Sequence, residues 1–273
     1  MKCIKLLIII LLLTIVDTMA GQSEESILDK IDFNDTTMIN SGLMWQTIAE
    51  YITEEQNKSA NPNSQMYNMI LAADNVLGRS CTSFVMYKSV YQYLISIFSE
   101  LGATQVVDYM LRMPYLGYLD ATDSEREEIM DIAERYERVK IGLKTPDIHA
   151  KTIKKLEFTL SEIKSKNTLI FFWSYSCPHC REILKELGKL SKKDRDLAII
   201  TVNVSGDFRK VKCLLKKSGL KNAYNIADGK GWNSPIVEDY AVDMTPSLFL
   251  LDENKILIAK PFDIEEVINL LGL

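Results

Sequence analysis

The chain has 273 residues, of which 47% are hydrophobic and 25% are charged. These values are close to globular averages, and the length suffices for two ordinary domains. The 37 acidic and 32 basic side chains give a net charge of −5, which leaves no basic footprint and argues against nucleic-acid binding. Residues 21–135 are mostly acidic whereas residues 140–217 carry many lysines. This contrast would help two halves dock, although surface charge alone carries little weight.

The first 20 residues are typical of an export signal. Two lysines form a positive n-region, the mostly apolar stretch Ile4–Val16 follows, and Thr18-Met19-Ala20 offers small residues for cleavage. The apolar stretch is shorter than the roughly 20 residues of a transmembrane helix. We therefore predict a signal peptide over residues 1–20 and a mature protein in the periplasm or cell envelope. The alternative is an N-terminal anchor that is not cleaved.

Four cysteines follow that segment: Cys81, Cys177, Cys180 and Cys213. Four cysteines are too few for a fold held together by disulfides in a chain of this length. Export would nevertheless place the protein in an oxidising compartment. Cys177 and Cys180 pair by proximity. Cys81 and Cys213 lie in different predicted domains, and we favour buried free thiols over a bridge between them.

Residues 21–140 predict an all-helical domain. Apolar side chains recur at helical spacing over residues 42–52, and Pro62 suits the first position of a second helix that ends near Gly78. The strongly apolar segment 82–101 predicts a buried helix. Its packed side chains are expected to be Tyr87, Tyr91, Phe98 and Leu101.

A shorter helix over residues 103–113 precedes interruptions at Pro114 and Gly117. A charged helix then runs to about Val139 and opens with a capping box at Ser124-Glu125-Arg126-Glu127. No metal-ligand spacing, catalytic dyad or phosphate-binding loop occurs in this half. Its aromatic and methionine side chains fit a core better than a ligand pocket, so the sequence assigns no role to the helical half.

The hydrophobic period changes after residues 141–146, where we place a domain boundary. The apolar run Thr168–Trp173 suits a buried strand. The other expected elements are strand 157–160, helix 181–190, strand 197–204, helix 207–218, strands 247–251 and 256–259 joined by the turn 252–255, and helix 264–271. This order predicts an α/β domain over residues 142–273, in which a parallel unit with a right-handed crossover precedes an antiparallel hairpin.

The motif Cys177-Pro178-His179-Cys180 lies between that buried strand and the next helix. The unpaired amides and the dipole at a helix N-terminus favour a thiolate over a thiol. A second cysteine three residues on is close enough to close a reversible disulfide. We therefore predict a dithiol redox centre in which Cys177 is the nucleophile and Cys180, a turn inward, resolves the mixed disulfide. Such a centre needs no cofactor and no metal.

Pro178 and His179 are expected to tune this centre. Pro178 fixes φ in the first helical turn. A donor or partial positive charge on His179 would stabilise the Cys177 thiolate and make the protein a stronger oxidant. We expect Trp173 to pack beside the cysteines and to form part of the substrate groove.

With the motif placed on this order of elements, residues 142–273 resemble the thioredoxin superfamily, and within it the TlpA/ResA-type thiol–disulfide oxidoreductases of bacterial envelopes. The matching residues are Thr145-Pro146-Asp147-Ile148, Phe172-Trp173-Ser174, Cys177-Pro178-His179-Cys180 and Met244-Thr245-Pro246. The resemblance implies a thioredoxin-like fold with a cis Pro246 beside the CxxC motif and with Thr245 and Pro246 bordering the substrate groove. The whole arrangement resembles exported thioredoxin-like proteins of Bacteroidetes.

One position departs from the family pattern. Plain thioredoxins carry a buried aspartate two residues before the tryptophan of this strand, where it assists proton transfer. Phe171 stands at that position here. Either the resolving step takes its proton acceptor from elsewhere, such as a water, or it is slower.

These observations predict an exported thiol–disulfide oxidoreductase that acts on protein disulfides and is recycled by a membrane or periplasmic redox partner. The TlpA-like pattern favours a reductase. The Pro-His dipeptide, which also occurs in DsbA-type oxidases, favours an oxidase. We prefer reduction or disulfide exchange, and the sequence indicates no oligomeric state.

Three other functions fit the sequence less well. A structural zinc site wants four ligands, but the chain has no second CxxC and only His149 as a further histidine. A peroxiredoxin-type peroxidase needs a Thr-x-x-Cys pattern, which is absent. A binding module switched by the dithiol, with the helical half as its working part, is the third alternative.

Overall fold

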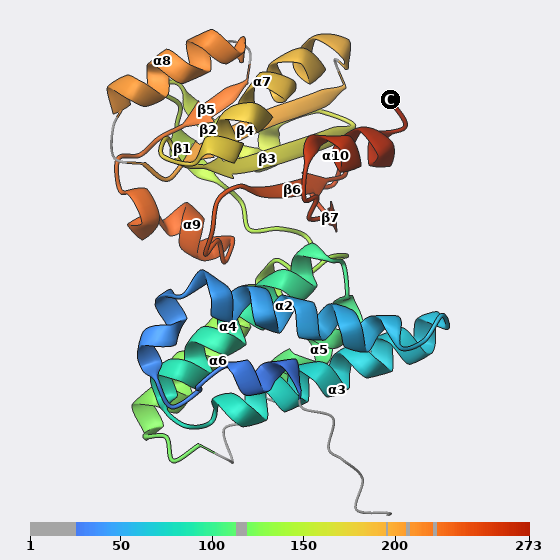
Figure 1. The fold of residues 1–273 in the computed structure, drawn as a ribbon. Coiled ribbons are helices and arrows are strands. Elements are labelled where there is room, and N and C mark those ends of the chain that lie inside the picture. Colours follow the sequence, from blue (N-terminus) through green and yellow to red (C-terminus); the bar gives the residue numbers. More distant parts are fainter. Residues whose placement is uncertain (1–25, 113–118, 195, 206–207, 221–222) are drawn as a thin grey trace, which may run out of the picture.

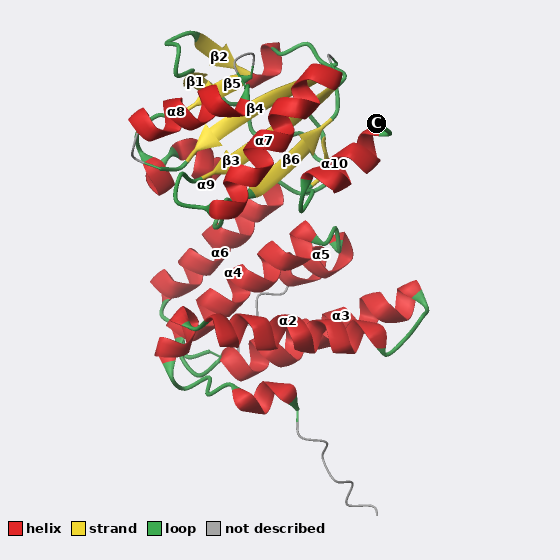
Figure 2. Ribbon diagram, turned by 45° about the horizontal axis from the view of Figure 1, so that its top comes forward, coloured by secondary structure: helices red, strands yellow, loops and turns green. Residues whose placement is uncertain are grey.

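The chain folds into two lobes in a computed structural model, which describes residues 26–273 apart from 113–118, 195, 206–207 and 221–222 (Figure 1). The predicted signal peptide lies outside the described residues, as do Pro114 and Gly117. One lobe is helical and the other is a sheet with helices against it (Figure 2). Within the described ranges, no helix is both long enough and apolar enough to cross a membrane.

The first lobe is all-α, as predicted. Its elements are η1 (Ile27–Lys30), η2 (Thr36–Asn40), α2 (Gly42–Asn57), α3 (Pro62–Ser80), α4 (Phe84–Glu100), α5 (Thr104–Arg112) and α6 (Asp123–Arg138). Helix α4 supplies the centre of its core, where Tyr87, Tyr91 and Phe98 are fully buried. The largely apolar sequence of α4 fits this central position, because a helix that packs against several neighbours keeps only a narrow polar face, which here carries Lys88.

Three local expectations in this lobe are wrong. Leu101 is 55% exposed, because it lies one residue beyond the last turn of α4. Helix α3 continues through Gly78 to Ser80. The capping box of α6 lies two residues earlier than predicted: Thr122 caps the helix, and the side chain of Glu125 bonds back to the backbone of Thr122.

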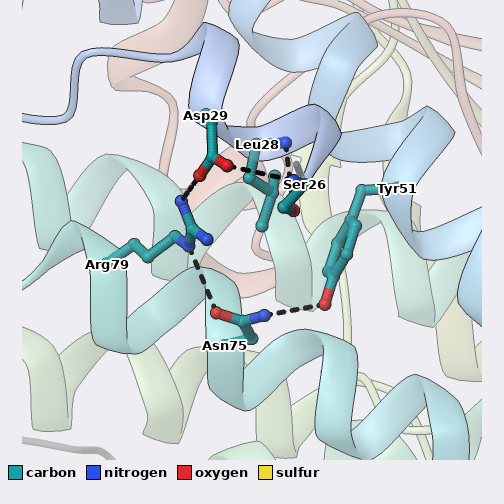
Figure 3. A network of polar contacts seen from close by, with 6 residues as sticks. All are labelled: Ser26, Leu28, Asp29, Tyr51, Asn75 and Arg79. Atoms are coloured by element: carbon teal, nitrogen blue, oxygen red, sulfur yellow. Dashed lines mark hydrogen bonds and ion pairs between the residues drawn. The ribbon is translucent and has the colours of Figure 1, made fainter. Parts of the chain in front are cut away.

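A polar network ties the start of this lobe to its helices (Figure 3). Arg79 on α3 pairs with Asp29 of η1 at 2.6 Å and donates to the Asn75 side chain at 3.3 Å. Asn75 in turn donates to the hydroxyl of Tyr51 on α2 at 2.8 Å. The network therefore fixes η1 and α2 against one face of α3.

The second lobe contains a five-stranded sheet in the order β5-β4-β3-β6-β7. Its elements are β1 (His149–Lys151), β2 (Glu157–Thr159), η3 (Leu160–Glu162), β3 (Asn167–Trp173), α7 (Pro178–Lys193), β4 (Leu197–Asn203), α8 (Phe208–Ser218), β5 (Tyr224–Ile226), η4 (Gly231–Asn233), α9 (Pro235–Asp239), β6 (Ser247–Leu251), β7 (Leu257–Ala259) and α10 (Ile264–Leu271). Strands β3, β4 and β5 are parallel, whereas β6 runs antiparallel to β3 and β7 antiparallel to β6. The predicted parallel unit followed by a hairpin is therefore confirmed. Strand β1, which pairs with β2, was not predicted.

The central strand β3 buries both of its faces, which explains its unbroken apolar sequence. Ile170 and Phe172 belong to the core on one side of the sheet, with Tyr240 and Phe249. Leu169, Phe171 and Trp173 belong to the core on the other side, which is packed by helices α7, α8 and α10. This second core also contains Cys180.

The two lobes are in contact where α6 reaches α9 and the loop after it. The Tyr136 hydroxyl on α6 donates to the Asp243 carboxylate. Arg138 at the end of the same helix lies 3.6 Å from Asp239 of α9. Ala241 packs against the cores of both lobes. The helical lobe is therefore positioned against the loop that leads into β6.

Candidate active site

The Cys-Pro-His-Cys motif forms the first turn of helix α7. Cys177 is the N-cap, and its Sγ accepts a hydrogen bond from the backbone N–H of Cys180 at 3.1 Å. Pro178 occupies the first helical position, where no N–H is needed. The helix therefore begins three residues earlier than the predicted Arg181, and the sulfur of Cys177 replaces the usual capping oxygen at the positive end of the helix dipole.

Cys177 and Cys180 form a disulfide with a Cα–Cα distance of 5.3 Å. The two sulfurs differ in access. Cys180 has no exposed surface, whereas Cys177 is partly exposed. An incoming reactant can therefore reach Cys177 and not Cys180.

The loop before Cys177 is anchored on the neighbouring strand. The Ser205 hydroxyl, just beyond β4, accepts from the backbone N–H of Tyr175 and lies 3.1 Å from the Ser174 hydroxyl. The Asn203 side chain donates to the carbonyl of Trp173 at 3.1 Å. Sequence analysis missed this anchor, although two polar residues at the end of an apolar strand are a usable signal.

Trp173 lies in the same buried cluster as Cys180, and Cys177 packs against that cluster. Its indole Nε1 is buried without a hydrogen-bond partner among the described residues. Phe171 is fully buried in the same cluster. The inner side of the dithiol is therefore apolar at the position where plain thioredoxins carry an acid.

The loop before β6 brings Thr245 and Pro246 to the dithiol. The Thr245 carbonyl oxygen lies 3.6 Å from Cys177 Sγ, although 68 residues separate the two in sequence. The Thr245–Pro246 peptide bond is cis, as the resemblance implied. The backbone ahead of Pro246 therefore borders the exposed side of Cys177.

His179 points away from the core and is exposed. Its Nδ1 lies 3.5 Å from the Glu182 carboxylate, one turn along α7. The imidazole also lines a cavity that it shares with Pro246. His179 thus borders the mouth of the site, next to Cys177 in sequence.

That cavity lies between the two lobes and has a volume of about 140 Å³. The helical lobe contributes Ser96, Ser99, Glu100 and Tyr136 to its lining. The sheet lobe contributes Lys260 as well as His179 and the loop around Pro246. Sequence analysis did not find Glu100 or Lys260 as site residues, although each is a lone charge at the end of an apolar segment.

Two of the charged groups that line the cavity, Lys260 and Glu100, have pKa values shifted far from their ordinary range. Burial lowers the pKa of the Lys260 ammonium to about 8, against the pull of Glu100 and Asp243. Burial also raises the pKa of the Glu100 carboxyl to about 7, against the opposing effect of Lys260. Both groups therefore titrate near neutral pH.

The two remaining described cysteines are free thiols, so the alternative of a bridge between them is excluded. Cys81 is partly buried and its Sγ lies 3.3 Å from the Leu77 carbonyl, while burial raises the pKa of its thiol. Cys213 is exposed on α8, so the expectation of a buried thiol is wrong there. Within the described ranges, no three His, Cys, Asp or Glu side chains gather into a possible metal site.

Comparison with known proteins adds three findings. Residues 141–260 match the AhpC/TSA family. The chain is 26% identical over 137 residues to the thioredoxin-like protein YneN of Bacillus subtilis, a match covering 46% of this chain and 76% of YneN.

Among solved structures, a thioredoxin-like protein from Bacteroides caccae has a TM-score of 0.57 at 16% identity, over 89% of this chain and 88% of its own. At this identity the likeness concerns the fold, and it extends over both lobes. A thiol–disulfide oxidoreductase from Bacteroides fragilis matches with a TM-score of 0.43 and 22% identity, over 48% of this chain and 98% of its own.

Proposed function

We propose that the Cys177–Cys180 dithiol exchanges disulfides with protein substrates, preferentially as a reductase. The match of residues 141–260 to the AhpC/TSA family and the similarity to a thioredoxin-like protein support this proposal. Cys177 at the tip of α7, with its sulfur against the Thr245 carbonyl, is the observation that carries the proposal.

The proposed cycle starts from the reduced dithiol. The Cys177 thiolate attacks one sulfur of a substrate disulfide, and the other substrate sulfur leaves as a thiolate. The Cys180 thiol then loses its proton and attacks Cys177. This step releases the second substrate thiolate and leaves the protein oxidised. Two electrons have moved from the protein to the substrate, and a partner dithiol must return them.

The exposures of the two sulfurs support this division of roles. Cys177 is accessible and accepts a backbone N–H, which favours its thiolate. Cys180 is sealed in an apolar cluster, where a thiolate is disfavoured until a mixed disulfide forms beside it. Pro178 and His179 tune the first turn, and Thr245 and Pro246 border the place where an extended substrate segment would lie. Trp173 is fully buried, so it supports the site from inside and does not line the substrate groove as predicted.

The reduction potential of the dithiol would show in which direction the reaction runs. A reduction potential near that of thioredoxin, about −270 mV, would fit a reductase, whereas a value near about −120 mV would fit an oxidase. We propose the reductase direction, with a membrane or periplasmic protein as the electron donor.

Insulin reduction by variants at the two cysteines tests the chemistry. Cys177→Ser is expected to abolish turnover, because it removes the nucleophile. Cys180→Ser is expected to accumulate mixed disulfides with substrates, because the resolving thiol is absent. Unchanged turnover in both variants would refute the assignment. Exposed Cys213→Ser, on α8, is the matched control and should leave turnover unchanged.

Export and domain organisation are part of the same proposal. We propose that residues 1–20 are a signal peptide, that residues 21–140 form a helical domain, and that residues 142–273 form the redox domain in the periplasm or cell envelope. N-terminal sequencing of protein from a periplasmic fraction checks the first point. A mature protein that begins at Gly21 is expected, and full-length protein in the cytoplasm would contradict it.

A further inference from the structure

The cavity between the lobes adjoins the dithiol. It carries charged groups that the binding of an extended polypeptide would not need. Its lining includes His179, which lies two residues beyond Cys177 in the first turn of α7, and Pro246, which follows the Thr245 carbonyl that contacts Cys177. The lining continues to Glu100 and Lys260. A volume of about 140 Å³ is close to that of a cavity that holds one benzene molecule. The space therefore suits one compact chemical group rather than a stretch of chain.

Lys260 is the most unusual group in this cavity. Its side chain is only 9% exposed, yet its Nζ forms no hydrogen bond or ion pair that the structure records among the described residues. The ammonium lies instead 5.4 Å from the ring centre of Phe249 and 5.8 Å from that of Tyr136. Buried charges in proteins are normally paired, so this ammonium is an unused donor that faces the cavity.

Glu100 provides the opposite charge on the other wall. It ends helix α4, is half-buried and faces the same cavity. No direct ion pair joins it to Lys260 among the described residues, although each carboxylate or ammonium influences the other electrostatically. Asp243 lines the same cavity, with one carboxylate oxygen bonded to the Tyr136 hydroxyl. Glu100 and Lys260 are therefore an acceptor and a donor of opposite charge, one from each lobe, that have no direct side-chain partner among the described residues.

We propose that this cavity binds the zwitterionic head group of a small cystine-type disulfide, with the substrate's α-carboxylate at Lys260 and its α-ammonium at Glu100. The proposal rests on the proposed disulfide exchange and names a second substrate class for the same dithiol. A residue inside a polypeptide carries neither charge on its main chain, so an extended protein substrate would leave both groups unpaired.

The reaction balances without another cofactor. The Cys177 thiolate attacks one sulfur of cystine and releases one cysteine thiolate. The Cys180 thiol then gives up its proton, which the departing cysteine thiolate takes up directly or through water, and Cys180 displaces that second cysteine as the Cys177–Cys180 disulfide forms. Cystine gains two electrons and becomes two cysteines, the protein dithiol is oxidised, and an external dithiol returns the protein to its reduced state.

Four small disulfides allow the contributions of the ammonium and the carboxylate to be measured separately. Cystine carries both, cystamine carries only the ammonium, 3,3′-dithiodipropionate carries only the carboxylate, and N,N′-diacetylcystine diamide carries neither. Pre-reduced protein is mixed with each in a stopped-flow instrument, and tryptophan fluorescence follows oxidation next to Trp173. Dividing each rate constant by that of the same disulfide with dithiothreitol removes differences in intrinsic reactivity.

In the unaltered protein, cystine should exceed each singly charged disulfide by about tenfold, since one charge-assisted hydrogen bond contributes about that factor. Lys260→Met should remove the preference for cystine over cystamine and keep the preference over dithiodipropionate. Glu100→Gln should do the reverse. Lys255→Met is the matched control, because Lys255 is equally buried, at 4% exposure, but lies in the β6–β7 turn away from the cavity.

Two results would overturn the proposal. One is equal relative rates for the four disulfides in the unaltered protein. The other is a loss of selectivity that is the same in Lys260→Met and Lys255→Met. Glu100 and Lys260 would then serve only the contact between the two lobes. Insulin reduction by the unaltered protein and by Lys255→Met distinguishes these failures from failure of the redox assignment, because both should reduce insulin if the dithiol works as proposed.

Discussion

Removing the Lys260 charge should stabilise the protein. The pKa of this lysine falls from 10.5 to about 8 on folding, and one pKa unit corresponds to about 1.36 kcal/mol. Holding the ammonium charged in the folded state therefore costs about 3 kcal/mol. Methionine fills a similar volume without a charge, so Lys260→Met should raise the free energy of unfolding at pH 7 by up to about 3 kcal/mol.

The pH dependence gives the argument a second test. Between pH 8 and 10.5 the unfolded chain binds the lysine proton and the folded protein has largely released it. Stability therefore rises with pH across this window, where the unfolded state binds more protons. The unaltered protein should gain about 3 kcal/mol there relative to Lys260→Met. Urea unfolding from pH 7 to 10.5 measures this, in a Cys81→Ala, Cys213→Ser background that prevents thiol exchange.

A lysine with the opposite environment provides the control. Lys140 pairs with Asp108 at 2.7 Å and with Glu137 at 3.0 Å, and these partners raise its pKa. Lys140→Met should therefore lower stability slightly. The reasoning would be refuted if Lys260→Met were less stable than the unaltered protein at pH 7, or if both lysine variants kept its rise in stability between pH 8 and 10.5.

Two further predictions follow from the packing and chemistry of α7. A Cβ at Gly188 would lie 1.8 Å from the Ser218 carbonyl oxygen at the end of α8, so Gly188→Ala should destabilise the protein by about 3 kcal/mol in urea unfolding. Gly78→Ala is the control, because a Cβ at this helical site would meet no neighbouring atom within 4 Å, and it should stabilise the protein by about 0.5 kcal/mol. Similar losses of stability in both variants would contradict the close packing of α7 against the end of α8. If the imidazole stabilises the Cys177 thiolate by about 1.4 kcal/mol, His179→Gln should make the reduction potential more negative by about 30 mV. Equilibration with glutathione measures this potential, and an unchanged value would show that His179 does not tune it.

The sequence was most informative where one pattern had one structural solution. The doubly buried strand β3 could be predicted because an apolar run of that length, ending at a CxxC and a helix, fits a central parallel strand. The hairpin of β6 and β7 followed from two apolar runs separated by a polar turn. The cis Pro246 beside the dithiol was reached through family resemblance and not from local pattern.

The parts that escaped prediction depend on contacts between distant segments. Glu100 and Lys260 are separated by 160 residues, and only the packing of α4 and α6 against the β6 loop places both around one cavity. Leu101 was expected in the core because its hydrophobicity continues the pattern of α4, but the helix ends just before it. Hydrophobic periodicity locates a helix well and its last turn poorly.

The hydrogen bonds from Ser205 and Asn203 have a consequence for the redox cycle. They hold Trp173, Ser174 and Tyr175 from the end of β4, so this support does not depend on whether the two sulfurs are joined. Opening the disulfide breaks none of these hydrogen bonds, so they can keep the approach to the sulfur in the same shape. A site of this kind would present nearly the same surface to successive reactants in both halves of its redox cycle. The return of electrons to the protein would then need little structural reorganisation.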